Sequence, residues 1–170
     1  MCMERKAIPL LAGILLLIFV FAFVSFSEAQ EGTTINRDEA LKVVKSGIAA
    51  EKEVVKKKLD VANAEKALSP HLTSTSLQAF LDDNIPQSDS KSYSRDNLMN
   101  YTPDFSYDNK TKAVYDKEHG LVYVYEQIKG KYYVIMLMKE RDMWKITGYN
   151  VNTKLLPEIE RLQEYGAVLK

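Results

Sequence analysis

The histidines of this sequence are the first residues to test for chemistry. His71 follows a proline, and His119 lies in the turn-forming run 117–120. Neither belongs to a spaced pattern such as HExxH, which places two imidazole ligands on one face of a helix. We therefore expect both histidines to be surface or loop residues, with a pocket contribution from His71 as the alternative.

Oxygen-bearing side chains at residues 104–109 resemble the start of a calcium-binding loop. They occupy the first, third and fifth positions, as such a loop requires. The sixth position should be glycine and is Asn109, and the twelfth should be glutamate and is Tyr115. We therefore expect a strand and a turn here, and no metal or cofactor anywhere in the chain.

The chain contains 10 tyrosines, and most lie in its second half. The rings of Tyr123, Tyr125, Tyr133 and Trp144, together with His71, are candidates to line a pocket, because such side chains offer an apolar body with a polar tip. Aromatic residues also favour strands and pair across them. We expect core packing, and a ligand-lining role is the alternative.

Sequence patterns for nucleophilic or nucleotide chemistry are missing. The chain has no GxSxG, no P-loop and no pairing of cysteine with histidine, and its serine-rich run at 88–94 has no partnered base. Residues 127–130 resemble the Gln-x-Val-x-Gly loop of cystatin inhibitors, but one residue and the valine are lacking. A glycine-containing hairpin accounts for them, and no catalytic residue is predicted.

Composition excludes several classes of protein. The 170 residues carry 23 basic and 23 acidic side chains, so the net charge is zero and there is no basic surplus to bind nucleic acid. The single cysteine, Cys2, excludes an intramolecular disulfide and a cysteine-based zinc cluster.

Residues 7–26 form an uncharged, largely aliphatic and aromatic segment that matches the thickness of a bilayer core. Arg5 and Lys6 precede it, and acidic residues dominate the stretch that follows. The positive-inside rule therefore predicts that the N-terminus is cytoplasmic and the rest of the chain is outside. We expect a secreted protein or an extracytoplasmic domain held to the membrane by this segment.

Whether the segment is removed stays open. Ser27 and Ala29 are small residues at the spacing of a cleavage site, which favours a signal peptide over residues 1–29. The apolar run is longer than most signal peptides contain, which favours a retained anchor. Residues 30–36 are expected to be a tether, and residues 37–170 a single exported domain.

Helices are expected in the front half of that domain. Asn36 and Glu39 form a capping-box signature ahead of helically spaced apolar residues, which predicts helices over about 37–58 and 62–68, with a single fused helix as the alternative. The dipeptide Ser69–Pro70 stops the second, and Thr73 or Ser74 caps another helix that ends near residue 84. Residues 86–103 are expected to be a long loop.

The second half changes to the pattern of strands. β-branched and aromatic runs separated by short turns predict antiparallel strands, with a bend or bulge at Gly148. The runs are 105–107, 112–115, 121–128, 131–139 and 143–151. Both faces of the longest strand are apolar, so cover is expected on both sides of the sheet. Pro157 opens a short last helix that ends near Gly166.

Helices followed by a curved antiparallel sheet of four to five strands define an α+β domain. The order resembles the NTF2-like (cystatin-related) folds, in which helices lie in the concavity of a bent sheet. The motifs at 68–73, 104–107, 122–126 and 144–146 resemble a family of uncharacterised exported proteins of Bacillus and relatives, over about residues 40–150. That family carries no established active site to transfer.

Two functions are therefore expected as alternatives. The preferred one is a non-enzymatic module, secreted or held at the membrane by residues 7–26, that binds a protein or a cell-envelope component. The other is a small-molecule binder or acid–base enzyme of the NTF2-like kind, which would need a pocket with a perturbed carboxylate or histidine in the concavity of the sheet.

Overall fold

The computed structural model of the protein describes residues 35–85 and 103–170. The predicted leader, the predicted cleavage site after Ala29 and nearly all of the predicted tether and loop lie outside these residues. Ile35–Lys170 form one compact unit. No helix within 35–85 and 103–170 has both the length and the apolar character that a bilayer crossing requires.

Three helices come first, and each begins at a side-chain cap. They are α2 (Arg37–Lys57), α3 (Val61–Leu68) and α4 (Ser74–Asn84). The Asn36 side chain accepts the Glu39 amide and the Glu39 carboxylate accepts the Asn36 amide, which confirms the predicted capping box. The Asp60 side chain accepts the Asn63 amide and the Thr73 side chain accepts the Ser76 amide, which caps the next two helices without a reciprocal bond.

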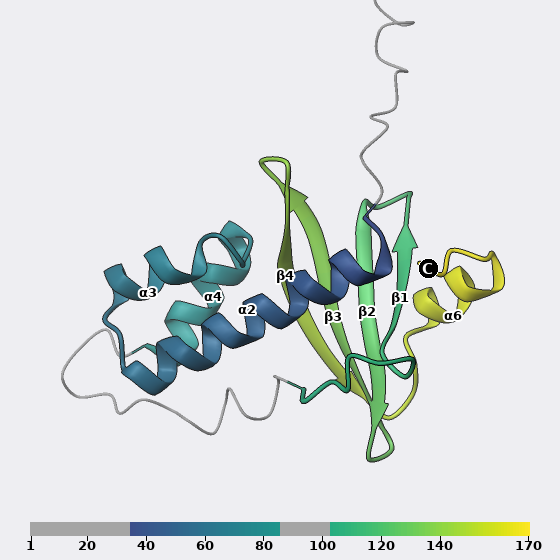
Figure 1. Cartoon of the computed structure of the whole chain (residues 1–170), viewed down its shortest axis with the longest axis horizontal. Coiled ribbons are helices and arrows are strands. Elements are labelled where there is room, and N and C mark those ends of the chain that lie inside the picture. The colour runs from purple at the N-terminus through teal and green to yellow at the C-terminus, as the bar shows by residue number, and fades with distance from the viewer. Residues whose placement is uncertain (1–34, 86–102) are drawn as a thin grey trace, which may run out of the picture. The chain divides into compact units, whose positions relative to one another are not determined.

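Four antiparallel strands follow in the order β1–β2–β3–β4, and a short helix closes the chain. The strands are β1 (Lys112–Asp116), β2 (Leu121–Ile128), β3 (Lys131–Glu140) and β4 (Met143–Asn152), and the helix is α6 (Pro157–Glu164). Turns of two residues join β2 to β3 and β3 to β4. The α+β class and the meander are therefore confirmed (Figure 1).

The predicted strand at 105–107 is wrong. The Ser106 amide donates to the Glu126 carboxylate instead of a backbone carbonyl, and Tyr107 has a φ of 54°, in the left-handed region. A strand would need extended backbone at both residues and a neighbouring strand to pair with. The segment is therefore a loop that is anchored to β2 through the side chain of Glu126.

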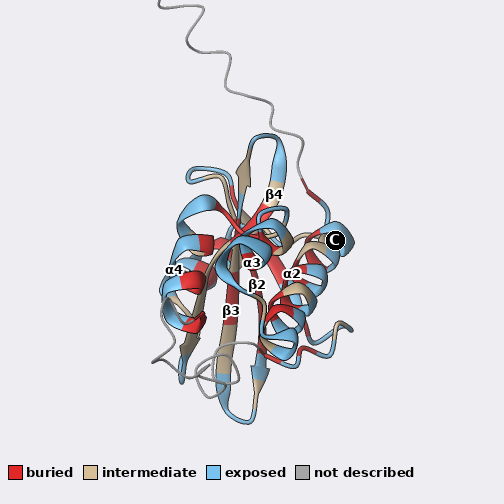
Figure 2. Ribbon diagram, turned by 90° about the vertical axis from the view of Figure 1, so that its left-hand side faces the viewer, coloured by how far each residue is buried: buried red, intermediate tan, exposed pale blue. Residues whose placement is uncertain are grey.

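The sheet is covered on both faces, as the apolar pattern of β3 predicted. Alternate residues of a strand point to opposite faces, and on β2 Val122 and Val124 pack with α2, whereas Tyr123 and Tyr125 pack with α6. Figure 2 shows buried residues on the sides of α2 and α4 that face the strands. The main core thus lies between α2 and the sheet.

This sheet curves toward α2. The rings of Tyr115 on β1 and Trp144 on β4 meet edge to face at 6.2 Å, although two strands separate them in the sheet. Gly148 marks the bend that the sequence predicted, because the register of β3 and β4 shifts beside it. The α2-facing surface is therefore the concave one.

Both edges of the sheet are paired with short segments. On the outer side of β4, the Thr73 amide donates to the Ile146 carbonyl at 2.9 Å and the Ile146 amide donates to the His71 carbonyl at 2.8 Å. On the outer side of β1, the Tyr115 amide donates to the Ala167 carbonyl at 3.0 Å. These additions satisfy backbone groups that an open edge would present to other chains.

Candidate functional site

A surface groove of about 430 Å³ lies between α3, α4 and the turn that joins β3 to β4. Its volume falls within the range of sites for small ligands, roughly 300–1,000 Å³. Leucines form its apolar part, and charged and hydroxyl side chains form the remainder. The lining residues are Val61, Glu65, Ser69, Leu72, Ser74, Leu77, Gln78, Leu81, Glu140, Arg141 and Lys145.

Helical spacing explains how two walls of the groove arise. Residues four apart share one face of a helix, and α3 contributes Val61 and Glu65 from such a face. On α4 the apolar positions Leu77 and Leu81 are likewise four apart. The caps at Asp60 and Thr73 fix where each helix begins, and therefore which face meets the groove.

Glu140 organises the third wall. One oxygen of its carboxylate accepts the Ser74 amide at 3.0 Å and the Ser74 hydroxyl at 2.9 Å, and the other accepts the Lys145 ammonium at 2.9 Å. The bond from the Ser74 amide is the largest of the causes that lower the pKa of Glu140 to about 2, and the Lys145 ammonium adds to it. Glu140 is therefore a fixed anion that joins α4 to the hairpin.

Lys145 is the most deeply buried charge in the groove. Its side chain is 7% exposed, and a buried ammonium needs a partner of opposite charge. Glu140 meets that need, so the two charges neutralise each other within the protein. This pair stabilises the wall and leaves the other charged lining residues to face outward.

The turn at Arg141 and Asp142 is strained. Their φ angles are 50° and 63°, and a two-residue turn with both residues in the left-handed region normally contains asparagine and glycine. A residue other than glycine costs roughly 1 kcal/mol in that conformation. The chain therefore holds an arginine at the groove at some expense in stability.

A second polar arrangement lies under α2. The Tyr149 hydroxyl donates a hydrogen bond to the carboxyl group of Glu51, which is 1% exposed. Burial raises the pKa of Glu51 to about 7, and the hydrogen bond from Tyr149 offsets part of that effect. Burial and the neighbouring Glu51 raise the pKa of Tyr149 well above its usual value.

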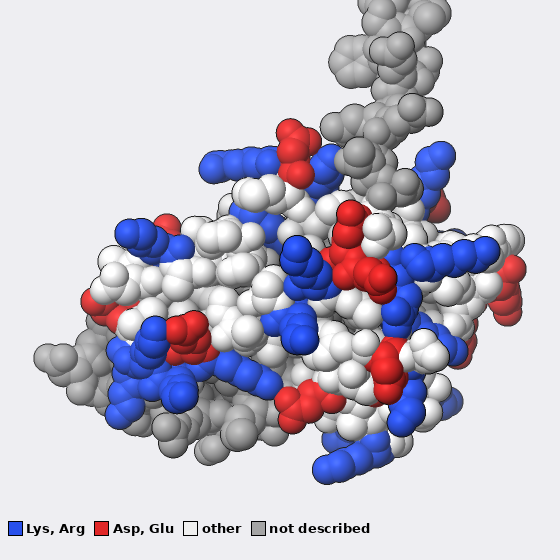
Figure 3. All heavy atoms as spheres, in the orientation of Figure 1, with Lys and Arg blue, Asp and Glu red and all other residues white. Residues whose placement is uncertain are grey.

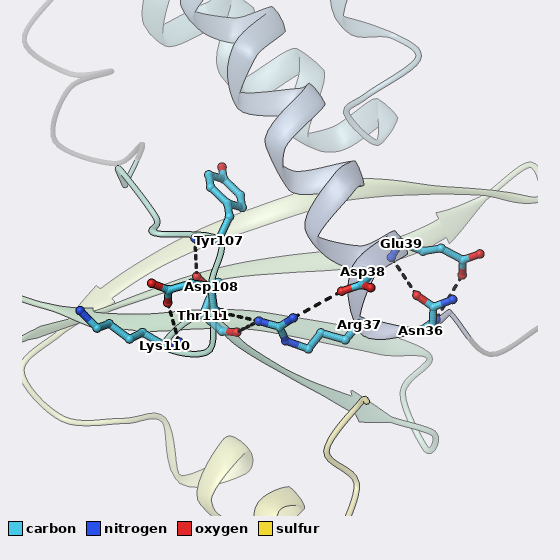
Figure 4. A network of polar contacts seen from close by, with 8 residues as sticks. All are labelled: Asn36, Arg37, Asp38, Glu39, Tyr107, Asp108, Lys110 and Thr111. Atoms are coloured by element: carbon cyan, nitrogen blue, oxygen red, sulfur yellow. Dashed lines mark hydrogen bonds and ion pairs between the residues drawn. The ribbon is translucent and has the colours of Figure 1, made fainter.

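The segment with the calcium-like pattern is held by hydrogen bonds between protein groups (Figure 4). Arg37 donates to the backbone carbonyls of Asp108 and Thr111, the latter at 2.8 Å. The Asp108 carboxylate accepts the Lys110 amide at 2.8 Å. These bonds define a turn that ties the start of α2 to β1.

Among the described residues, side chains that could together hold a metal ion lie at the turn between β1 and β2. Single ligand atoms of Asp116, Glu118 and His119 lie within 4.8 Å of one another. The Asp116 carboxylate accepts the Glu118 amide at 3.0 Å and the His119 amide at 3.2 Å, and it contacts the His119 ring nitrogen at 2.8 Å. The pKa of His119 is raised by that contact. Turn formation accounts for every one of these bonds.

The residues expected to line a pocket lie on two faces of the sheet. Tyr123 and Tyr125 pack in the cluster that includes α6, and the hydroxyl of Tyr125 accepts a hydrogen bond from Gln163. Tyr133 and Trp144 pack against the cluster on the α2 side. His71 belongs to the segment that pairs with β4. Their role in binding stays a prediction, and none of them lines the groove described above.

The sequence patterns did not identify the groove residues. Lys145 stands between Trp144 and Ile146, and such an alternation is typical of a strand with one exposed face. Its burial and its ion pair with Glu140 are apparent only in the structure. The contribution of α3 and α4 depends on how these helices meet the hairpin, which no local pattern indicates.

Comparison with known proteins places the chain in a family. No curated protein and no solved structure matches the chain. A family model described as "Protein of unknown function (DUF3993)" matches residues 36–128, which is more than half of the chain. The match begins at the cap of α2 and ends with β2, so it includes the helical walls of the groove. The chain therefore belongs to this family of proteins of unknown function.

Proposed function

We propose that the protein is an exported or membrane-anchored module, without catalytic activity of its own, that binds a protein or cell-envelope partner through the groove between α3, α4 and the β3–β4 turn. The apolar segment at 7–26 and the charges that flank it support export. On this proposal the N-terminus is inside and the domain is outside, secreted if the leader is cleaved after Ala29.

One observation carries the proposal: the concave face of the sheet is filled. Aliphatic side chains of α2, among them Leu41, Val44 and Ile48, pack there against Val124 and Ile135. A small-molecule site of the NTF2-like kind would use that volume. The groove, by contrast, opens at the surface and combines leucines with unlike charges, as recognition sites do.

Site-specific photo-crosslinking in intact cells tests the binding site. A photoreactive residue in place of Gln78 in the groove should yield a discrete crosslinked product. The same residue in place of Ala49, which is exposed on α2 and does not line the groove, is the control and should yield none. Equal products from both positions, or none from either, would contradict the proposal.

Alkaline phosphatase fused after residue 170 tests the location, because this enzyme needs the disulfides that form outside the cytoplasm. We expect an active fusion. Deleting residues 7–26 should abolish its activity without abolishing its synthesis. An active fusion after that deletion would disprove the export part of the proposal, and the mass of the mature N-terminus would distinguish a cleaved leader from an anchor.

We also propose the NTF2-like relationship and an origin among Bacillus and relatives. A long helix across the concave face of a curved antiparallel sheet supports the first, and the motifs that resemble exported proteins of those bacteria support the second. An experimental structure whose sheet has a different strand order would overturn the NTF2-like relationship.

A second candidate function has one observation in its favour. Glu51, with a pKa of about 7 beside Tyr149, has the properties of an acid–base group on the concave face. Its 1% exposure leaves a substrate no access in this conformation. Titration with small phenols, followed by the amide NMR signals of α2 and β4, tests this candidate. Saturable shifts of these amide signals that the Glu51→Gln variant no longer shows would favour the enzyme. The absence of such shifts would favour the binding module.

A further inference from the structure

We propose that the ligand of the groove is a short peptide with both ends free, recognised as a zwitterion with an apolar side chain. This inference rests on the proposed function and narrows its partner to one cell-envelope component, a short free peptide, by the chemistry of the bound group. In this arrangement Glu65 contacts the ammonium end, Arg141 contacts the carboxylate end, and the leucines receive the side chain.

The charges of the groove divide into a satisfied pair and two that face solvent. Lys145 and Glu140 bind each other at 2.9 Å. Glu65 and Arg141 also line the groove, and neither forms an ion pair with any residue of 35–85 or 103–170. One is a carboxylate on α3 and the other a guanidinium on the hairpin turn, so the two available charges are of opposite sign and on different walls.

That division of charge selects the class of ligand. Arg141 would attract a phosphate or other anion, and Glu65 would repel it. A simple cation would be attracted by Glu65 and repelled by Arg141. A ligand with one charge of each sign is favoured by both. The whole chain has a net charge of zero, although basic side chains gather at the lower left of the face drawn in Figure 3.

Size and apolar surface narrow the class further. The groove holds about 430 Å³, toward the lower end of the range for small-ligand sites. Leu72, Leu77 and Leu81 line it, and burial of an apolar side chain against them contributes about 25 cal/mol for each Å² removed from water. A peptide of two residues supplies two opposite charges and apolar side chains within such a volume.

The guanidinium of Arg141 suits the carboxylate end of a peptide. It presents paired donors that match the two oxygens of a carboxylate. Its left-handed backbone is shared by Lys129 in the turn between β2 and β3, so the argument for Arg141 rests on its charge and its place in the groove.

Calorimetric titration of the full-length chain with the dipeptide Leu-Leu tests the proposal. We expect saturable binding that weakens about tenfold or more, roughly 1.4 kcal/mol, when either the amino end is acetylated or the carboxyl end is amidated. Glu65→Gln should remove the preference for a free amino end only. Arg141→Gln should remove the preference for a free carboxyl end only. Each variant thus reports on one contact and not on folding.

Lys66→Gln is the matched control, because Lys66 is exposed beside Glu65 and does not line the groove. It should leave both preferences unchanged. Absence of saturable binding, or equal binding of the free and doubly blocked peptides, would overturn the zwitterion proposal. If Gln78 still crosslinks in cells, the proposed function stands and the partner is recognised by other chemistry. If that crosslink also fails, the groove itself is the wrong site.

Discussion

Glu51 is a carboxyl group held where water does not reach it, and its environment sets the pH dependence of the fold. Burial raises its pKa to about 7, from about 4.5 in the unfolded chain. The folded protein therefore holds a proton that the unfolded chain releases between these two values. By linkage, stability is fully present below about pH 4.5 and falls as the pH rises through 7.

Glu51→Gln should remove this pH dependence. An amide carries no charge at any of these pH values. The variant therefore avoids a loss in the free energy of unfolding that reaches about 3 kcal/mol near pH 8 in the native chain. Urea unfolding at several pH values between 4 and 8 measures it. Glu53→Gln, on the exposed side of the same helix, is the control and should retain the native fall. A native chain as stable at pH 8 as at pH 5 would contradict the assignment.

Sequence patterns alone do not identify Glu51 as a buried group. It stands in the charge-rich stretch 51–58, where a solvated helix face is the ordinary interpretation. Its burial results from the packing of α2 on β4, which brings it to Tyr149 from 98 positions away along the chain. Cap residues such as Asn36 could be predicted, because their contacts lie within three residues.

At the scale of the elements, the close approach of α2 to β4 depends on Gly47. A Cβ built there would lie 2.5 Å from the Cδ1 atom of Ile146, which is fully buried. Glycine in a helix costs about 1 kcal/mol relative to alanine, and here it allows the helix to contact the sheet. A glycine in the middle of α2 therefore marks a helix–strand contact.

Gly47→Ala should destabilise the domain by about 1–2 kcal/mol, because overpacking exceeds the gain in helix propensity. Ile146→Val removes the opposing Cδ1 atom and by itself costs about 1 kcal/mol. The loss of stability in the double variant should be smaller than the sum of the two single losses by about 1 kcal/mol or more. Chemical unfolding of all four proteins measures that coupling. Strict additivity would show that the two residues do not touch.

Elements themselves were largely predictable, because their signals are local. The period of the apolar residues and the caps located α2, α3 and α4, and the short turns identified the meander. The strand expected at 105–107 failed because Glu126, far along the chain, takes the Ser106 amide. A side chain that replaces a strand partner leaves no trace in the local pattern.

At the scale of the whole molecule, two short segments from elsewhere in the chain extend the sheet at its two edges. Residues 71–73 extend it beyond β4 and residues 167–169 extend it beyond β1. The carbonyl of Lys170 also accepts the Arg37 amide at 3.1 Å, which links the start of α2 to the last residue. Neither addition was predicted, since three-residue segments carry no periodic signal of their own.

Removal of residues 167–170 should destabilise the domain by about 3 kcal/mol, because four backbone hydrogen bonds and the packing of Leu169 are lost. It should also promote association, since the outer side of β1 becomes free to pair. Thermal unfolding and light scattering measure the two effects. Lys170→Ala keeps the backbone and should change stability by less than about 0.5 kcal/mol. A truncated chain as stable as the intact one would refute this account.

The bond between Arg37 and Lys170 also has a consequence for the timing of folding. A ribosome adds residues from the front, so α2 is made long before the carbonyl that receives its first amide. Until residue 170 has been added, the sheet lacks its outermost rung beside β1, and the helix lacks that anchor. The contacts of residues 167–170 therefore form after the helices and strands before them have been made, and until then the start of α2 and the outer side of β1 lack these partners.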